Sequence, residues 1–479
     1  MATLTLFNSL SRALEPFSPL DPANVRVYTC GPTVYNFQHV GNMRAFLFAD
    51  TLGRVLRWKG FPLTHIINIT DVGHLTSDAD EGDDKMERAA RAQQRSIWEV
   101  AAFYTEAFKR DVARLNILPP ARWSVATDHV AEMIAFAERI EANGAAYRLD
   151  SGLYFDVKSV PRYGELARPD LDTAEEAPAE GRIDLVEGKR HPADFALWRT
   201  SAADEHRQME WDSPWGRGAP GWHLECSVMS RQYLGHPFDI HTGGIDHREI
   251  HHPNEIAQNQ AFCGCADPGA RIWMHNNFLV ERSAKMSKSS GHFTTLQTLV
   301  DWGVHPLAYR LLCLGSHYRS ELEFNGEALG AALTRLKRLT LTVSRWLDGS
   351  GTGSGSAQPY LDRLDTAVSD DLNTPMALVA LDELLADKRL SQAERRHGLA
   401  AFDQVLGLDL LVIGRADLRL APSTAALTAE DVADRLAERR EARAARDFAR
   451  SDAVRDALTA AGVEVMDGDP LGWDWRPIL

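Results

Sequence analysis

The chain has 479 residues, which is enough for several domains with buried cores. Its hydrophobic content of 44% and charged content of 25% are ordinary for a globular protein. The net charge of −15 argues against indiscriminate binding of nucleic acid over the whole surface, although a local basic stripe could still contact RNA.

The five cysteines, an odd number spread through a long chain, are not typical of a disulfide framework and favour a reducing compartment. No apolar run approaches the ~20 residues that a membrane-spanning helix needs. The first residues also lack the charged and apolar regions of a secretory signal. We therefore expect a cytoplasmic protein without a membrane segment.

Residues 27–44, VYTCGPTVYNFQHVGNMR, have the pattern of a strand, a turn and the start of a helix. An apolar, β-prone run is broken by Gly31 and Pro32, and apolar residues at helical spacing follow from residue 40. The free N–H groups at such a helix start can face an anion. On its own, His-x-Gly-Asn is more typical of a turn histidine beside a packing glycine than of an anion site. The functional interpretation depends on three distant stretches, 221–226, 251–255 and 285–289.

Strand-like and helical segments alternate through the first half of the chain. A second strand is predicted at 64–70, and we expect the acidic loop at 78–84 to be solvated rather than to bind a metal. Helical periodicity with few breakers runs from 87 to 115. Further on, we expect a helix at 130–143, short strands at 146–149 and 153–157, and an irregular insertion at 159–192.

The second half begins with strands and becomes helical. A helix should start within 221–226, and a strand at 238–241 should end in Gly243-Gly244. A strand at 272–280 precedes the polar loop 285–289. Helices are predicted at 360–368, 374–385 and 392–406, a charged helical region at 431–461, and a flexible Gly/Ser linker at 348–359. Alternating strands and helices predict an α/β fold with a Rossmann-like parallel sheet, followed by α-helical C-terminal domains.

Four residues have the side chains that zinc prefers. Cys30 ends the first predicted strand, Cys226 lies five residues beyond Gly221, and His251 and Glu255 share one helical face at i and i+4. The alternative is that the cysteines pack as small hydrophobic residues and that the histidines at 251 and 252 lie on the surface. Spacing alone does not decide between these alternatives.

The pair Cys263-x-Cys265 is tighter in sequence. One intervening residue is too few for the usual metal knuckle, so we interpret this pair as incidental.

Lys285 and Lys288 flank Met286-Ser287 on a polar loop after a strand. Two ammonium groups there could stabilise the charge that develops on a departing pyrophosphate. The alternative is an ordinary exposed basic loop.

Five arginines recur at steps of three and four residues near the C-terminus, which would put them along one helical stripe: Arg435, Arg439, Arg443, Arg446 and Arg450. Such a stripe could follow a phosphate backbone, or it could be a solvated face paired with neighbouring acids. We leave both interpretations open.

Several of these motifs together resemble one known family. CGPTVYNFQHVGN at 30–42 resembles the HIGH-type signature of class I aminoacyl-tRNA synthetases in its cysteinyl-tRNA synthetase form, and KMSKS at 285–289 is identical to the second class I signature. The resemblance extends over essentially the whole chain, through GWHLECS (221–227), HTGGID (241–246), HHPNEIAQ (251–258), DFALW (194–198), WDSPWG (211–216) and DLNTP (371–375).

The chain departs from that family's usual pattern at three positions, and its segment 73–82 lengthens the loop after Asp71. Val40 replaces the usual isoleucine, Pro253 stands where glutamate is common, and Thr242 stands where a third glycine is frequent.

The resemblance implies roles for individual residues. The zinc ligands would be Cys30, Cys226, His251 and Glu255, with one Zn²⁺ per chain. The catalytic residues would be His39, Asn42, Lys285 and Lys288, which would act on ATP and its triphosphate together with Mg²⁺. The substrate- and ATP-binding residues would be Gly31, Thr33, Gly41, Thr70, Trp222, Gly243, Gly244, Asp246 and Lys288, with Trp222 lining the cysteine pocket.

The resemblance also implies an activity and a domain order. The partners would be L-cysteine, ATP and tRNA(Cys), and the protein would act as a monomer. The domains would be a catalytic domain at 1–315 with a connective insertion at about 120–200, a helical junction at 316–347, the linker at 348–359, a helical anticodon-binding-type domain at 360–421 and a small tRNA-binding module at 422–479. The alternatives are a ligase that joins cysteine to an amino sugar, and a non-catalytic RNA-binding paralogue.

Overall fold

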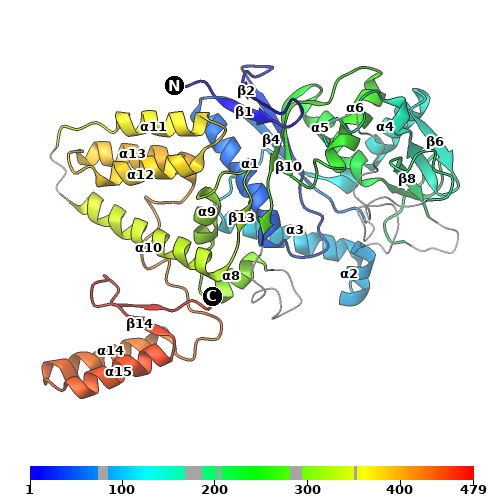
Figure 1. Ribbon diagram of the computed structural model, residues 1–479. Coiled ribbons are helices and arrows are strands. Elements are labelled where there is room, and N and C mark those ends of the chain that lie inside the picture. The colour runs from blue at the N-terminus through cyan, green and yellow to red at the C-terminus, as the bar shows by residue number, and fades with distance from the viewer. Residues whose placement is uncertain (74–84, 168–185, 202–206, 281–293, 350–352) are drawn as a thin grey trace.

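The computed structural model describes residues 1–73, 85–167, 186–201, 207–280, 294–349 and 353–479. Its centre is a five-stranded, all-parallel sheet in the order β11-β10-β3-β4-β5 (Figure 1). The strands are β3 (Val25–Thr29), β4 (Leu63–Ile69), β5 (Arg122–Val125), β10 (Phe238–Gly244) and β11 (Ala270–Asn276). This sheet confirms the predicted Rossmann-like α/β fold.

Side chains alternate between the two faces of this sheet, as strand geometry requires. Val27 and Ile67 point into the core beneath α1 (Val40–Trp58) and α3 (Ile97–Arg114). Tyr28 and Ile66 point into the opposite core, beneath three further helices. These helices are α4 (Val130–Ala142), α5 (Trp222–Leu234) and α6 (His251–Cys263).

The helix predicted at 87–115 is two helices. Helix α2 (Lys85–Gln93) ends before Gln94, whose φ is 53°, and α3 starts after Ser96. Ser96 forms a capping box in which its side chain accepts from Glu99 N while the Glu99 side chain accepts from Ser96 N. The prediction was wrong because apolar residues recur on both sides of the break and hide this local start signal.

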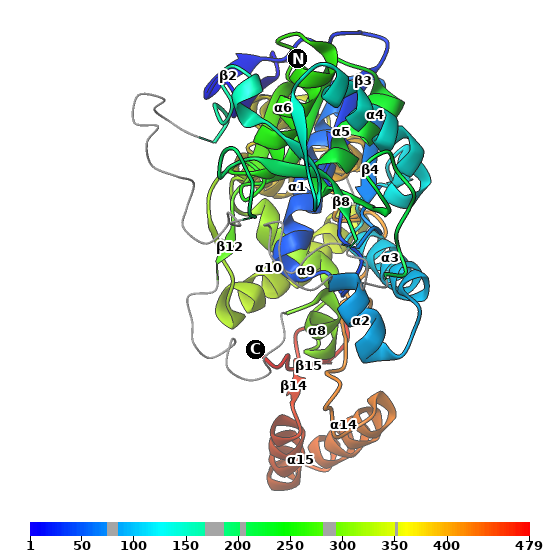
Figure 2. The same ribbon diagram turned by 90° about the vertical axis from the view of Figure 1, so that its right-hand side faces the viewer.

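The segment between β5 and β10 contributes a four-stranded antiparallel sheet, in the order β6-β7-β8-β9. It lies on the side of the sheet that carries α4 and α5 (Figure 2). Its strands are β6 (Ala146–Leu149), β7 (Gly152–Phe155), β8 (Phe195–Thr200) and β9 (Gly218–Pro220). Smaller pairs join β1 (Thr5–Asn8) to β2 (Ala13–Pro16), and β12 (Leu279–Val280) to β13 (Leu322–Glu323), so the strand predicted at 272–280 is divided.

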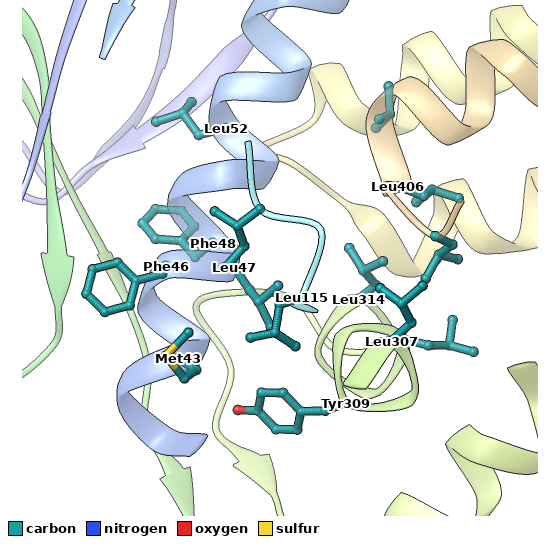
Figure 3. Packing of buried hydrophobic residues seen from close by; sticks show 14 of the residues in the cluster. Met43, Phe46, Leu47, Phe48, Leu52, Leu115, Leu307, Tyr309, Leu314 and Leu406 are labelled. Carbon is teal, nitrogen blue, oxygen red and sulfur yellow. The ribbon is translucent and has the colours of Figure 1, made fainter. Parts of the chain in front are cut away.

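After the sheet, the described residues up to 406 form the helices α8 (Leu296–Asp301), α9 (Pro306–Leu314), α10 (Gly326–Asp348), α11 (Gln358–Ser369), α12 (Thr374–Ala386) and α13 (Gln392–Leu406). They share a continuous hydrophobic core with α1. Figure 3 shows Leu47 of α1, Leu307 of α9 and Leu406 of α13 lining the same interior. Among the described residues of the predicted linker, Gly355 N donates to Arg389 O over 3.1 Å.

The last segment has a small core of its own and projects from the rest of the chain (Figure 1). It contains α14 (Ala429–Ala444), α15 (Phe448–Ala460), β14 (Val463–Val465) and β15 (Trp473–Trp475). Asp474 attaches it to α10 through Lys337 Nζ at 2.5 Å, and Ile478 N donates to Trp302 O at 2.9 Å.

The predicted arginine stripe is not continuous. The chain turns between α14 and α15, where Arg446 has a φ of 59°, so the five arginines do not share one helix. Arg439 is buried and pairs with Asp467 at 3.0 Å, and Arg450 pairs with Glu438 at 2.8 Å. These contacts favour local pairing over the alternative of an uninterrupted phosphate-binding row.

Cys263 and Cys265, interpreted above as an incidental pair rather than a metal knuckle, form a disulfide that the sequence interpretation did not predict. Gly264 ends α6 in the left-handed conformation and brings the two Cα atoms to 5.2 Å, within disulfide range. In the part of the chain that is described, no helix is both long and apolar enough to cross a membrane.

Candidate active site and metal centre

A cavity of about 550 Å³ opens at the carboxyl ends of the parallel strands, which is where ligands bind in open α/β sheets. It is lined by twelve of the predicted site residues: Cys30, Gly31, Thr33, His39, Gly41, Asn42, Thr70, Trp222, Cys226, Gly244, Asp246 and His251. Gly243 and Glu255 lie just behind its wall, on β10 and α6. Lys285 and Lys288, like the acidic loop 78–84, lie outside the described residues.

Four buried side chains converge at the inner end of this cavity. One ligand atom from each of Cys30, Cys226, His251 and Glu255 lies within 4.8 Å of all the others. Cys30 Sγ is 4.0 Å from Cys226 Sγ, and His251 Nε2 is 3.1 Å from Glu255 Oε1. Two thiols, an imidazole and a carboxylate form a donor set that suits zinc, so these residues fit the metal that the resemblance implies.

The electrostatics of this cluster favour a cation. A hydrogen bond from Cys30 lowers the pKa of Cys226 to about 7, against the effect of burial. Burial alone would lower the pKa of His251, but its hydrogen bonds to Cys226 and Glu255 raise that pKa to about 10. Burial also acts to raise the pKa of Glu255, but the neighbouring His241 and His251 together outweigh it and lower that pKa. The cluster thus retains negative ligand atoms and a proton that a divalent ion can displace.

Sequence reasoning missed the histidines around this donor set. His241 Nε2 is 3.0 Å from Glu255 Oε2, and His252 Nε2 is 3.3 Å from Cys30 Sγ. His252 Nδ1 is in turn 2.7 Å from His275 Nε2. Together with Cys30 and Glu255, His241 and His252 form a second buried group that could hold a metal ion. Such partners orient the groups that bind a metal, and the only sequence signal was the density of histidines at 241–252.

Two of the unusual residues are compatible with the site. Pro253 stands in the first turn of α6, where a backbone N–H has no partner within the helix. Thr242 is buried on β10, and its Oγ1 is 2.7 Å from Thr29 Oγ1 on β3. Neither residue moves His251 or Glu255 off the shared face of α6.

Glycines allow the backbone to pass closely beside the cavity. A Cβ atom on Gly31 would lie 1.6 Å from Asn68 O, and Gly31 N donates to Asn68 Oδ1 over 2.7 Å. A Cβ atom on Gly243 would lie 2.7 Å from His247 Nδ1. Any side chain at residue 31 would therefore push the segment that carries Cys30 away from β4.

The N-terminus of α1 faces the other end of the cavity. His39 is the N-cap, and its Nδ1 accepts from Asn42 N over 3.1 Å. Asn42 Nδ2 donates to Gln38 Oε1 over 2.8 Å, which fixes the asparagine beside the helix start. Burial lowers the pKa of His39, so its neutral form is favoured. The positive end of the dipole of this 19-residue helix can attract a phosphate.

Trp222 forms a wall between these two ends. It begins α5, and its ring centroid lies 4.4 Å from that of His251 and 6.2 Å from that of His247. A small substrate held at the donor set would therefore contact an aromatic face while its remaining groups point toward α1.

Known proteins are similar to this chain over most of its length. The family model for the tRNA synthetases class I (C) catalytic domain matches residues 16–334. The cysteine–tRNA ligase of Novosphingobium aromaticivorans is 60% identical, over 99% of this chain and 97% of that protein. The cysteine–tRNA ligase of Zymomonas mobilis is 55% identical, over 99% of this chain and 98% of that protein.

Solved structures share the fold at low identity. A Mycobacterium tuberculosis methionyl-tRNA synthetase in complex with methionyl-adenylate superposes with a TM-score of 0.53 at 16% identity, over 80% of this chain and 88% of that one. LeuRS of Agrobacterium radiobacter K84, in a ternary complex, gives 0.56 at 13% identity, over 86% of each chain. The chain therefore belongs to the class I aminoacyl-tRNA synthetases, in the family of the cysteine–tRNA ligases.

Proposed function

We propose that this chain is a cysteine–tRNA ligase that activates L-cysteine with ATP and transfers it to the 3′-terminal ribose of tRNA(Cys). The observation that carries the proposal is the buried donor set of two cysteines, a histidine and a glutamate at the inner end of the cavity. Relatives that match almost the whole chain bear the same activity in their names.

In the first step, the cysteine carboxylate attacks the α-phosphorus of ATP and pyrophosphate leaves with its electron pair. In the second step, a ribose hydroxyl attacks the acyl carbon, AMP leaves, and the hydroxyl proton is released. Neither step needs a covalent bond to the protein, so this chain contributes mainly position and charge. His39 and Asn42 would hold the phosphates at the start of α1, with Mg²⁺ bound to ATP, and Lys285 and Lys288 would stabilise the departing pyrophosphate.

Selection of the amino acid is the harder task. Cysteine and serine differ by one atom, and apolar contacts separate such near-isosteres poorly. When bound by Cys30, Cys226, His251 and Glu255, one zinc ion per chain supplies a soft Lewis acid that favours a thiolate over a hydroxyl. Trp222 would then close the pocket against larger side chains.

The parts of the chain beyond residue 359 support tRNA as the acceptor. The helices of 360–421 would form the anticodon-binding-type domain, and 422–479 a further tRNA-binding module. A ligase for a small amino sugar has no use for such a tail, and a non-catalytic paralogue has no need for the donor set. The working unit would be a cytoplasmic monomer.

The test is cysteine-dependent exchange of pyrophosphate into ATP, followed by charging of bulk tRNA in the same preparation. We expect exchange with cysteine, little with serine, and charging of a tRNA fraction. Exchange without charging would favour the amino-sugar ligase, and absence of exchange from folded, zinc-loaded protein would favour the non-catalytic paralogue.

A further inference from the structure

A second cavity, of about 700 Å³, lies on the outer face of α6, the face opposite His251 and Glu255. Ile256, Ala257 and Ala261 form its apolar floor. Segment 159–166 forms the facing wall, together with residues from the N-terminal strand pair. Among the described residues, none of those assigned above to cysteine, ATP or zinc lines this cavity.

The Cys263–Cys265 disulfide stands at the rim of this cavity, and Cys265 is among its lining residues. Cys265 is exposed and Cys263 is half-buried. A Cβ atom on Gly264 between them would have no neighbour within 4 Å, so one side of the bridge faces open solvent. An incoming sulfur atom therefore has access to Cys265.

This disulfide is poorly placed to stabilise the fold. Its stabilisation of a fold grows with the length of loop that it closes, and here it closes three residues at a single helix end. That end is already held, because Asn143 Nδ2 donates to Ala261 O over 2.8 Å and Gly264 N donates to Gln260 O over 2.9 Å. Cys30, Cys226 and Cys313 are free thiols, so the chain does not form disulfides indiscriminately.

The cavity also offers charges that suit a particular class of thiol. Arg162 and Glu165 form an ion pair on its wall, and their side chains are 71% and 28% exposed. A guanidinium can pair with a carboxylate and a carboxylate with an ammonium. A small thiol that has a carboxylate and an ammonium could pair its carboxylate with Arg162 and its ammonium with Glu165. Its sulfur atom could then approach Cys265.

We propose that Cys263–Cys265 is a thiol–disulfide exchange site whose cavity accepts small aminothiols that carry both an ammonium and a carboxylate, such as L-cysteine, or the corresponding disulfide. A thiolate attacks Sγ of Cys265, the protein S–S bond breaks, and Cys263 leaves as a thiolate that takes up a proton. A second thiol attacks the mixed disulfide and departs as the small-molecule disulfide. One protein disulfide and two thiols thus become two protein thiols and one small disulfide.

The first experiment uses the full-length, zinc-loaded Cys313→Ser protein, in which the exchange pair are the only cysteines outside the donor set. The disulfide form is incubated with L-cysteine, cysteamine or 3-mercaptopropionate, acid-quenched, alkylated and mapped by peptide mass spectrometry. Corrected for thiolate fraction, L-cysteine should react roughly fivefold faster than the two singly charged thiols, and Arg162→Gln should remove this advantage. Rates that follow thiolate fraction alone, or a disulfide that resists all three thiols, would overturn the proposal.

The second experiment compares the accessibility of the two sulfur atoms, each as the only thiol of the pair. Treated with L-cystine, Cys263→Ser should form a mixed disulfide at Cys265 roughly tenfold faster than Cys265→Ser forms one at Cys263, because Cys265 is the exposed partner. Equal rates would contradict the claim that Cys265 is the accessible sulfur. Both readouts are independent of tRNA charging, so the exchange site and the proposed ligase activity can fail separately.

Discussion

Replacement of Arg310 by methionine should destabilise the chain more than any change to a surface arginine. Arg310 is 1% exposed on α9, and its Nη2 lies 2.6 Å from Asp50 Oδ2 on α1. Its Nε donates to Leu406 O over 2.7 Å and its Nη1 to Leu115 O over 3.0 Å. One guanidinium thus joins the parallel-sheet core, through α1 and the end of α3, to the helix α13.

The size of the destabilisation depends on the buried Asp50 carboxylate, which loses its partner Arg310. Breaking a buried ion pair by removing one partner costs about 3–5 kcal/mol, because the other charge stays buried. Asp50 keeps Arg54, whose Nε lies 2.7 Å away, so we expect the lower end, about 3 kcal/mol. Arg363→Met is the matched control, since its ion pair with Glu383 is exposed and should contribute about 0–1 kcal/mol.

The assay is urea unfolding followed by far-ultraviolet circular dichroism, with all variants compared at one pH and salt concentration. The Asp50→Asn, Arg310→Met double variant should be less destabilised than the sum of the two single variants, because the orphaned charge is removed. If Arg310→Met lies within about 1 kcal/mol of the Arg363→Met control, the buried network is not what joins these helices.

Three further predictions concern the metal, the tail and pH. Cys226→Ser should release zinc and abolish cysteine activation, and retained metal with normal pyrophosphate exchange would remove Cys226 from the site. Deletion of the residues after Pro422 should weaken tRNA charging and leave adenylate formation largely intact, whereas equal losses would mean that the tail supports the core. Burial raises the pKa of Asp403 to about 6, so its contribution to stability is present below pH 3.8 and is lost as the pH rises through 6. The free energy of unfolding of the unmodified chain, minus that of Asp403→Asn, should be about 1–3 kcal/mol lower at pH 7 than at pH 4. If this difference between the two proteins is the same at both pH values, the assignment is contradicted.

Four of the five parallel strands could be predicted because they are short apolar runs separated by clear turn and helix signals. The edge strand β5 was not predicted, because its sequence, RWSV, has no apolar run. A helix start was missed where apolar periodicity continues across it. The Ser96–Glu99 capping box lies within such a continuous apolar pattern and divides one predicted helix into two. The opposite error occurred at Arg446, where regular arginine spacing continued across a turn that is marked by the positive φ of Arg446 and by the N-cap Asp447. Periodicity therefore predicts which residues are helical better than it predicts where one helix stops.

The candidate site depended more strongly on resemblance. His251 and Glu255 share a helix face that spacing alone predicts, but no local pattern joins them to Cys30 and Cys226. The surrounding histidines, His241 and His252, come from a strand and a helix and meet only when β10 and α6 pack together. Sequence reasoning could not find contacts that the tertiary fold alone creates.

The most direct test of the proposed selection of cysteine is zinc X-ray absorption of the full-length protein, alone and with L-cysteine or L-serine. We predict two sulfur and two lighter ligands at zinc in the free protein, a third sulfur when L-cysteine is added, and no change with L-serine. A sulfur count that L-cysteine leaves at two, in protein that still catalyses cysteine-dependent exchange, would show that another feature of the cavity selects the substrate.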